Sequence, residues 1–312
     1  MRKIVAYLLM TGSLLVSCKH DSKFSGNPIL PDFHADPSAH VFDGTLWLYP
    51  SHDIAGTKYW WKMFDWHAFS SNDLVHWKDH GVIFSLKETT WAKRYAWAPD
   101  AMQRNGKYYF YFCASDIPGN DNSCANCIGI AVSDRPEGPF KDALGKPLVK
   151  SSPTEKPAMD PCIFIDDDQQ AYLYYGQIDL RVLKLKEDMV TIDGEIKHVD
   201  IKNFGEGIWI HKYKGKYYLS YPMFENNKAS RLAYSMGDSP YGPFQFKGVI
   251  IDNHSRNIHH SIVQYKGQWY LFYHVQGPSA YERRVCAEFL EYNDDGTIKP
   301  IKMTKTGIRL KQ

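Results

Sequence analysis

The sequence predicts an all-β protein with the architecture of a five-bladed β-propeller. Three observations predict it: a short turn followed by an aromatic-rich strand recurs five times, another strand precedes each turn, and no long segment shows the 3.6-residue period of a helix. The turns are centred on positions 44, 106, 169, 215 and 267, so successive units are 62, 63, 46 and 52 residues apart. A two-sheet sandwich is the alternative fold, but it predicts no sequence pattern that repeats from unit to unit.

The five turn-and-strand segments share one pattern. Four of them have glycine at the second turn position, where a tight hairpin needs a residue that tolerates a positive φ. The segments are Asp43–Tyr49, Asn105–Phe112, Asp168–Tyr175, Lys214–Tyr221 and Lys266–Tyr273. The strands expected before them are His40–Phe42, Ala101–Gln103, Pro161–Ile165, Ile208–Lys212 and Ser261–Tyr265. A further strand and turn follow in several units, at Phe69–Asp73, Ala131–Asp134 and Ala233–Asp238.

The composition is that of a globular protein with a surplus of aromatic side chains. The chain has 312 residues, of which 44% are apolar and 23% are charged, which excludes a disordered or collagen-like chain. The formal net charge is +2, from 37 basic and 35 acidic residues without a basic block, so no nucleic acid is expected as a partner. The aromatic fraction reaches 15%, and aromatic rings both favour strands and form flat platforms for sugar rings.

The N-terminus predicts an exported protein. Arg2 and Lys3 precede a mostly apolar run, Ile4–Val16, which is too short to span a bilayer comfortably. Residues 15–18 resemble the lipobox of bacterial lipoproteins, in which the cysteine, here Cys18, is diacylated and becomes the first mature residue. We therefore expect a signal peptide over 1–18, a short tether over 19–26 and the catalytic propeller over 27–312; a plain secretory signal with a chance cysteine is the alternative.

The resulting expectation for localisation is a cell-envelope lipoprotein, in the outer membrane or periplasm of a Gram-negative bacterium. No other segment approaches 18 uninterrupted apolar residues, so the membrane is contacted only through the lipid anchor. Five cysteines remain after Cys18, and an odd number leaves at least one unpaired within the chain. Cys124 and Cys127 form a C-x-x-C pair in a loop-like segment, which indicates a local disulfide or two free thiols and only weakly a zinc site.

A polar residue stands just before the first strand of each unit. These residues are Asp36, Asp100, Asp160, Glu206 and His259, which lie 8, 6, 9, 9 and 8 residues before the turn of their unit. The first strand of a propeller blade lines the central channel, so the five side chains are expected to converge at one end of the axis. Clustered carboxyls raise one another's pKa, which lets one act as an acid while another acts as a base. This pattern alone favours a carboxylate-based glycosidase and a metal-binding sugar receptor about equally.

Five motifs, in order, resemble those of glycoside hydrolase family 43, the five-bladed propeller arabinofuranosidases, xylosidases and arabinanases. The motifs are Asn27–Ser38, Trp97–Asp100, Met159–Asp168, Gly205–Lys212 and His259–Ile262, and the resemblance covers about residues 27–300. It implies an inverting reaction with Asp36 as general base and Glu206 as general acid. Asp160 would raise the pKa of that acid and hold it in place, and Asp100 matches a position without a catalytic role.

The resemblance also implies residues that bind ligands. His259, or its neighbour His260, matches a family histidine that holds a central Ca²⁺ or Na⁺ ion or its water shell, although a histidine that only hydrogen-bonds within the channel is the alternative. No cofactor is expected for the chemistry itself. Arg283 and Arg284 resemble the fifth-blade arginine that contacts the sugar, and at least one of the two is expected to point inwards. Trp97 is expected to form a wall of the subsite.

The function predicted from the sequence is the removal of a terminal pentose, α-L-arabinofuranose or β-D-xylose, from plant cell-wall polysaccharides or oligosaccharides. The alternatives are an endo-acting arabinanase of the same fold and a non-catalytic sugar-binding propeller. Exo action is favoured because the segment between Ser51 and Phe69 is long and aromatic, so that it could wall off one side of the channel. In that segment, residues 59–61 and Trp66 cap the pocket or pack into a loop core. A monomer is expected.

Overall fold

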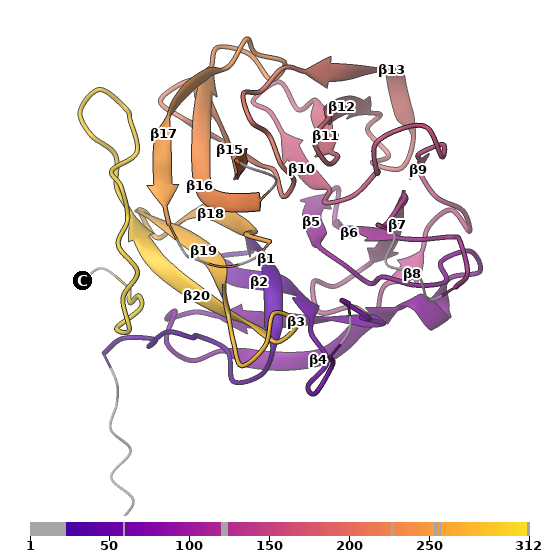
Figure 1. The fold of residues 1–312 in the computed structure, drawn as a ribbon, viewed down its shortest axis with the longest axis horizontal. Helices are drawn as coiled ribbons and strands as arrows, with labels where there is room; N and C mark the ends of the chain where they lie inside the picture. Colours follow the sequence, from indigo (N-terminus) through magenta and orange to yellow (C-terminus); the bar gives the residue numbers. More distant parts are fainter. Residues whose placement is uncertain are drawn as a thin grey trace, which may run out of the picture.

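The computed structural model describes residues 23–58, 60–119, 124–225, 228–252, 255 and 257–310, and nearly all of its regular structure is antiparallel β-sheet. Five sheets stand around a central axis, which confirms the predicted five-bladed propeller (Figure 1). Among these residues, the helical content is one 3₁₀ turn, Leu86–Glu88, and no helix is long and apolar enough to cross a membrane. The expected signal peptide and residues 19–22 of the tether lie outside the described residues.

Each blade is built from strands that are consecutive in the chain. Blade 1 contains β1 (His34–Phe42), β2 (Thr45–His52), β3 (Asp65–Ser71) and β4 (Lys78–Ser85). Blade 2 contains β5 (Pro99–Arg104), β6 (Lys107–Ala114), β7 (Cys127–Ser133) and β8 (Lys141–Asp142), with β9 (Val149–Lys150) also paired to β7. Blade 3 contains β10 (Cys162–Ile165), β11 (Ala171–Tyr175), β12 (Leu180–Leu185) and β13 (Ile192–Val199). Blade 4 contains β14 (Trp209–Tyr213), β15 (Lys216–Glu225), β16 (Lys228–Gly237) and β17 (Gln245–Ile251), and blade 5 contains β18 (His260–Tyr265), β19 (Gln268–Gln276) and β20 (Arg283–Leu290).

The turn between the first two strands of a blade follows from its sequence. In blade 1, Phe42 pairs with Thr45, so Asp43 and Gly44 form a two-residue hairpin loop with φ values of 49° and 76°. Positive φ at both central residues is the signature of a type I′ turn, whose twist matches that of the flanking strands. The same pair of positive φ values recurs at Asn105–Gly106, Lys214–Gly215 and Lys266–Gly267.

Tyrosines of the second strands join each blade to the next. The hydroxyl of Tyr49 donates to the carbonyl of Pro136, that of Tyr111 to Met189, and that of Tyr174 to Pro240, at 2.6–2.9 Å. All three rings are fully buried, so each places an aromatic face in the interblade core while its polar end is satisfied. The surplus of tyrosine in the repeated strands therefore serves blade packing.

The ring closes where the two ends of the described chain meet. Backbone N–H groups of residues 25–27 donate to carbonyls of residues 305–308, and Ile29 donates to Val285 of β20. The side chain of Asn27 adds bonds to both the backbone of Ala287 and the carboxylate of Glu288. In Figure 1 the indigo and yellow segments accordingly run side by side. The first motif thus closes the propeller and positions the start of β1.

Asp100 corrects the expectation that all five polar residues meet at the channel mouth. It lies inside β5, where one carboxylate oxygen accepts from Ser38 and pairs with His40, and the other accepts from the backbone N–H of Ile163. Asp100 lies six residues before the turn of its blade, whereas the other four residues lie eight or nine before theirs. It therefore lies further along its strand, away from the channel mouth. A buried carboxylate with these partners links blades 1, 2 and 3.

Candidate active site

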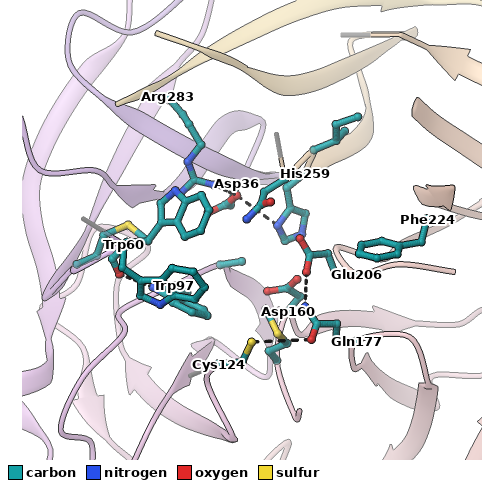
Figure 2. Close-up of a pocket in the computed structure, with 16 residues that line it drawn as sticks. Asp36, Trp60, Trp97, Cys124, Asp160, Gln177, Glu206, Phe224, His259 and Arg283 are labelled. Atoms are coloured by element: carbon teal, nitrogen blue, oxygen red, sulfur yellow. Dashed lines mark hydrogen bonds and ion pairs between the residues drawn. The ribbon is translucent and has the colours of Figure 1, made fainter. Parts of the chain in front are cut away.

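A cavity of about 180 Å³ lies at one end of the channel and is lined by all five blades (Figure 2). Two kinds of segment reach this end: the starts of the first strands, and the loops through which the chain returns after the second strands. Six of the catalytic and ligand-binding residues predicted from the sequence line the cavity: Asp36, Trp97, Asp160, Glu206, His259 and Arg283. The cavity therefore combines three carboxyls, two cationic side chains and an aromatic wall.

Asp36 lies in a β-bulge, which aims its side chain into the cavity. The register of β1 slips between Ala35 and Ser38, and Asp36 has a φ of 50° although a proline follows it. Such a φ is rare for a residue other than glycine, and bulges commonly re-aim side chains at active sites. Asp160 repeats the feature in blade 3, with a φ of 53° before Pro161. Two Asp-Pro motifs thus hold carboxylates in strained positions at the same channel end.

Asp36 is surrounded by donors and positive charge. One carboxylate oxygen accepts from Nη1 of Arg283 at 2.7 Å, and the other accepts from the hydroxyl of Ser51 at 2.7 Å. Nδ1 of His259 lies 3.5 Å from the first oxygen. Nδ1 of His274 lies 3.4 Å from it but accepts from the backbone N–H of Asp36 at 3.1 Å, and burial lowers the pKa of His274 to about 3, so this imidazole is neutral. Burial alone raises the pKa of Asp36, but the Arg283 guanidinium and the His259 imidazole outweigh burial and hold the pKa well below its usual range. Asp36 is therefore ionised at any working pH.

Glu206 is held on the opposite side of the cavity by a Gly-Glu-Gly turn before β14. Its Oε2 accepts from the side-chain amide of Gln177 at 2.7 Å. A β-carbon on Gly205 would lie 2.9 Å from the carbonyl oxygen of Pro222, and one on Gly207 would lie 3.0 Å from the ring of His259. Gly207 also has a φ of 62°, so neither flanking glycine accommodates a side chain without displacement.

Asp160 and Glu206 form a coupled pair of buried carboxyls. The backbone N–H of Gly207 donates to Oδ2 of Asp160 at 3.1 Å, which places the two acids on adjoining segments. Burial is the main cause that raises the pKa of both, and the charges of Glu206 and Asp36 raise that of Asp160 further, against the opposing charge of His259. Since each carboxylate disfavours ionisation of the other, the pair retains a proton at a pH where an isolated carboxyl has lost it.

His259 is placed between the two sides and behaves as an ion-pair partner. Burial lowers the pKa of His259, but the contact with Asp36 and the charges of Asp160 and Glu206 outweigh burial and raise it. Within the described part of the chain, His259 belongs to no group of three metal-ligating side chains. A cation held by His259 through its water shell stays a prediction of the family resemblance. His260 points elsewhere, with its Nε2 against the hydroxyl of Ser220 at 2.6 Å.

Of the two neighbouring arginines, the structure brings only Arg283 into the cavity. Its backbone N–H, Nε and Nη2 all donate to the carboxylate of Asp53, at 2.8–2.9 Å, while Nη1 reaches Asp36. Arg284 faces away: its Nη2 donates to the carbonyl of Pro31, and its guanidinium lies over the ring of Phe33. The expectation of a sugar contact for Arg284 is therefore corrected, because adjacent residues of β20 point to opposite faces of the strand.

Aromatic residues form one wall of the cavity. Trp97 lines it, stacks on Tyr95 with ring centroids 4.4 Å apart, and donates from Nε1 to the carbonyl of Trp61. Trp60 and Trp61 line it from the insertion between β2 and β3, and the Arg283 guanidinium lies over the Trp61 ring. Two other tryptophans are core residues: Trp66, which the sequence left open between pocket and core, is fully buried in β3, and Trp209 donates to the carbonyl of Ile262. Tyr59 lies outside the described residues.

Sequence reasoning missed several lining or supporting residues, and four of them show why: Gln177, Asp53, Cys124 and Phe224. Three of them lie in loops that follow the second strand of a blade, and Phe224 lies near the end of such a strand. The signal that could have found them is topological, because these returning segments end at the same side of the propeller as the starts of the first strands. Cys124 and Cys127 are both free thiols, as are Cys113, Cys162 and Cys286.

Fold and site together define a carboxylate-based glycosidase: a five-bladed propeller in which an ionised carboxylate and a proton-retaining pair face one sugar-sized cavity with an aromatic wall. The family model described as glycosyl hydrolases family 43 matches residues 25–298. A xylosidase/arabinosidase of Bacteroides ovatus is 35% identical, over 87% of this chain and 95% of the relative. The chain belongs to glycosyl hydrolase family 43, whose members need no cofactor for catalysis.

Solved structures agree with this assignment. A family 43 β-xylosidase/α-arabinofuranosidase from a compost microbial metagenome, in complex with xylotriose and in a calcium-free form, matches with a TM-score of 0.79 and 35% identity, over 90% of this chain and 97% of the other. An α-L-arabinofuranosidase from Clostridium thermocellum matches with a TM-score of 0.75 and 38% identity, over 88% and 95%. The chain is thus a glycosidase of this family over nearly its whole described length.

Proposed function

We propose that this enzyme removes a terminal pentose, β-D-xylose or α-L-arabinofuranose, from plant cell-wall oligosaccharides such as xylo-oligosaccharides, with inversion at the anomeric carbon. The observation that carries the proposal is the opposite ionisation of the two sides of the cavity: Asp36 is held charged, and the Glu206–Asp160 pair holds a proton. Relatives named for xylosidase and arabinosidase activity, and a neighbour solved with xylotriose, support the choice of sugar.

In the proposed reaction, Glu206 donates its proton to the glycosidic oxygen as the bond to the anomeric carbon breaks. Asp36 accepts a proton from a water molecule that forms the new bond to that carbon from the opposite face. Asp160 keeps Glu206 protonated by its charge and proximity, and His259 and Arg283 balance the negative charge around Asp36. For this displacement, the carboxyls of Asp36 and Glu206 need room for water between them, a separation of about 6.5–9.5 Å.

Exo action fits the size of the site. A cavity of about 180 Å³ is smaller than the roughly 300–1,000 Å³ pockets that take drug-sized ligands, which suits one sugar ring better than an extended chain. The insertion between β2 and β3 supplies three lining residues, Trp60, Trp61 and Met63, which support its role as a wall. The insertion is shorter than the sequence indicated, because Trp66 already belongs to β3.

A substrate panel with product analysis tests the proposal. Aryl β-xyloside, aryl α-arabinofuranoside, xylo-oligosaccharides and linear arabinan are compared, and NMR follows the anomeric configuration of the first product. Single pentoses released with inverted configuration are expected. Fragments of two to six sugars released early from arabinan would establish the endo-acting alternative, retained configuration would remove Asp36 as general base, and no hydrolysis of any glycoside would establish the sugar-binding alternative.

The proposed reaction routes no step through the channel cation that the family resemblance implies; His259 would hold a Ca²⁺ or Na⁺ ion there through its water shell. We also propose that the protein is a lipoprotein of the cell envelope, anchored through Cys18. We expect it to be a monomer. Radiolabelled palmitate should label the wild-type chain and leave Cys18→Ala unlabelled, and light scattering on the mature propeller should give the mass of one chain. Equal labelling of both would reject the anchor.

A further inference from the structure

One face of blade 1 gathers three histidines and two aspartates away from the cavity. The blade-1 histidine cluster comprises His34 of β1, His52 of β2, Asp65 and His67 of β3, and Asp79 of β4. The ring centroids of His52 and His67 lie 4.3 Å apart, and His34 lies 5.1 and 5.3 Å from them. Three imidazoles packed this closely cannot all carry a proton, because like charges at that distance repel strongly. The proposed reaction uses none of them.

Three members of the cluster are arranged as metal ligands. His52, Asp65 and His67 each offer a donor atom within 4.8 Å of the donors of the other two. Donors around a tetrahedral zinc ion are roughly 3.5 Å apart, given bonds of about 2.0–2.2 Å, so rotation of these side chains is enough to close the set. The three are partly exposed, which lets an ion reach them and leaves a position for water.

The surroundings of the three ligands resemble an outer shell. Asp79 places Oδ1 3.5 Å from Nδ1 of His67, and a carboxylate at one nitrogen is the usual partner of an imidazole that binds metal through the other. His34 is 1% exposed, and its ring nitrogens contact the backbone of Asp32 rather than another side chain. The imidazole stacks on His52 with an interplanar angle of 17°.

From this geometry we infer that blade 1 holds a binding site for a divalent transition-metal ion, Zn²⁺, with His52, Asp65 and His67 as ligands and Asp79 as the outer partner. Two imidazoles and one carboxylate suit zinc, whereas calcium and magnesium prefer oxygen ligands alone. The site is separate from the channel, where His259 faces carboxylates.

The position of the site gives the ion a structural effect on the cavity. His52 ends β2 and Asp65 begins β3, so the two ligands stand at the two ends of the insertion that carries Trp60 and Trp61. Their side chains already pair at 2.6 Å. The next residue after His52 is Asp53, which holds Arg283 in place. A bound ion would join these segments and stabilise the aromatic wall relative to the unfolded chain.

Isothermal titration calorimetry with ZnCl₂ on tag-free, chelator-treated mature protein tests the site, together with thermal unfolding. Wild type should bind one equivalent and show a raised Tm with zinc. Asp65→Asn and His67→Gln should each weaken binding by at least about tenfold, and Asp79→Asn by roughly tenfold, since loss of an outer partner typically weakens metal binding 10–100-fold. Asp79→Asn is a partly exposed, isosteric change, so it keeps the test valid if a ligand variant folds poorly.

Two control variants locate the binding. His76→Gln removes a histidine of the same blade that also pairs with an aspartate, Asp73, but is not one of the three clustered donors, so this variant should bind zinc like wild type. His259→Gln should also bind like wild type. The inference is overturned if wild type binds no zinc, if Asp65→Asn and His67→Gln bind it like wild type, or if His259→Gln abolishes binding and so places the ion in the channel.

Discussion

Asp36 and Glu206 occupy equivalent positions in blades 1 and 4, yet the charged and hydrogen-bonding groups around them differ. The base side of the cavity, made by blades 1 and 5, surrounds Asp36 with a guanidinium, two imidazoles and a serine hydroxyl. The acid side, made by blades 3 and 4, gives Glu206 a second carboxyl and one neutral amide. Both side chains are buried, so burial does not distinguish them.

The difference teaches that the neighbours, rather than the station in the repeat, decide which carboxyl is the acid. Burial raises the pKa of both groups, and only on the base side do enough positive charges lie close enough to reverse the shift. The lowered pKa that keeps Asp36 ionised also makes it a weaker base. The pair on the acid side instead shares a retained proton, as a general acid needs near neutral pH.

Asp36→Asn should give the largest effect. The change removes the proton acceptor and leaves the cavity otherwise nearly isosteric, so kcat should fall by about 10²–10⁴-fold on every substrate, whatever its leaving group. Circular dichroism checks that the variant folds. If aryl glycosides with good leaving groups keep wild-type rates, Asp36 does not activate the water.

Glu206→Gln should reduce activity by an amount that depends on the leaving group, unlike Asp36→Asn. Natural oligosaccharides need protonation of the leaving oxygen and should lose about 10²–10⁴-fold in kcat/KM, whereas a dinitrophenyl glycoside, whose leaving group needs no proton, should lose much less. Steady-state kinetics on the two substrate types measure the ratio. Equal losses on both would contradict the role of general acid.

The repeat and the motifs predicted the fold and the positions of Asp36, Asp160 and Glu206, because hairpin turns and aromatic strands leave local signals. The outer strands of four blades were not predicted. β13 illustrates the reason: six of its eight residues are exposed, so it lacks the apolar alternation by which a strand is recognised in a sequence. Pairing with β12 holds β13 in place, and the local sequence of β13 does not show that pairing.

Ionisation states could not be predicted in the same way. Asp53 and Gln177 lie far in sequence from the acids that they influence, and a loop position gives no sign of which carboxyl it will face. Asp100 shows the converse: it shares the station in the repeat, yet a difference of two or three residues in spacing buries it between blades.

Gln177→Met should raise the pKa of Glu206 and leave that of Asp36 unchanged. The amide of Gln177 donates to Oε2 of Glu206 and so favours its ionised form; without that donor, the pKa of Glu206 rises. Because the acid works protonated, the basic limb of the kcat/KM profile should move to higher pH, by roughly one unit if the bond is worth about 1.5 kcal/mol. The acidic limb should stay in place.

Gln103→Met is the matched control, since the Gln103 amide bonds to Tyr108 away from the cavity. Its profile should overlay that of wild type. A basic limb of Gln177→Met that moves to lower pH, or does not move, would show that Gln177 supports the loop without tuning the acid.

Ser51→Ala should give the smallest effect, and it probes how strongly the base side is held. The serine hydroxyl donates to Oδ2 of Asp36, so its loss raises the pKa of Asp36. The pKa of Asp36 starts well below its usual range because of Arg283 and His259, which the change leaves in place, and a rise of about one unit still leaves Asp36 ionised above pH 5. The kcat/KM at pH 7 should therefore change by less than about threefold, with no new acidic limb between pH 5 and 7. Ser70→Ala, which removes a β3 hydroxyl that faces His80, is the control for loss of a serine in this blade. An acidic limb that appears between pH 5 and 7 in Ser51→Ala, but not in the control, would mean that the hydroxyl rather than Arg283 keeps the base ionised.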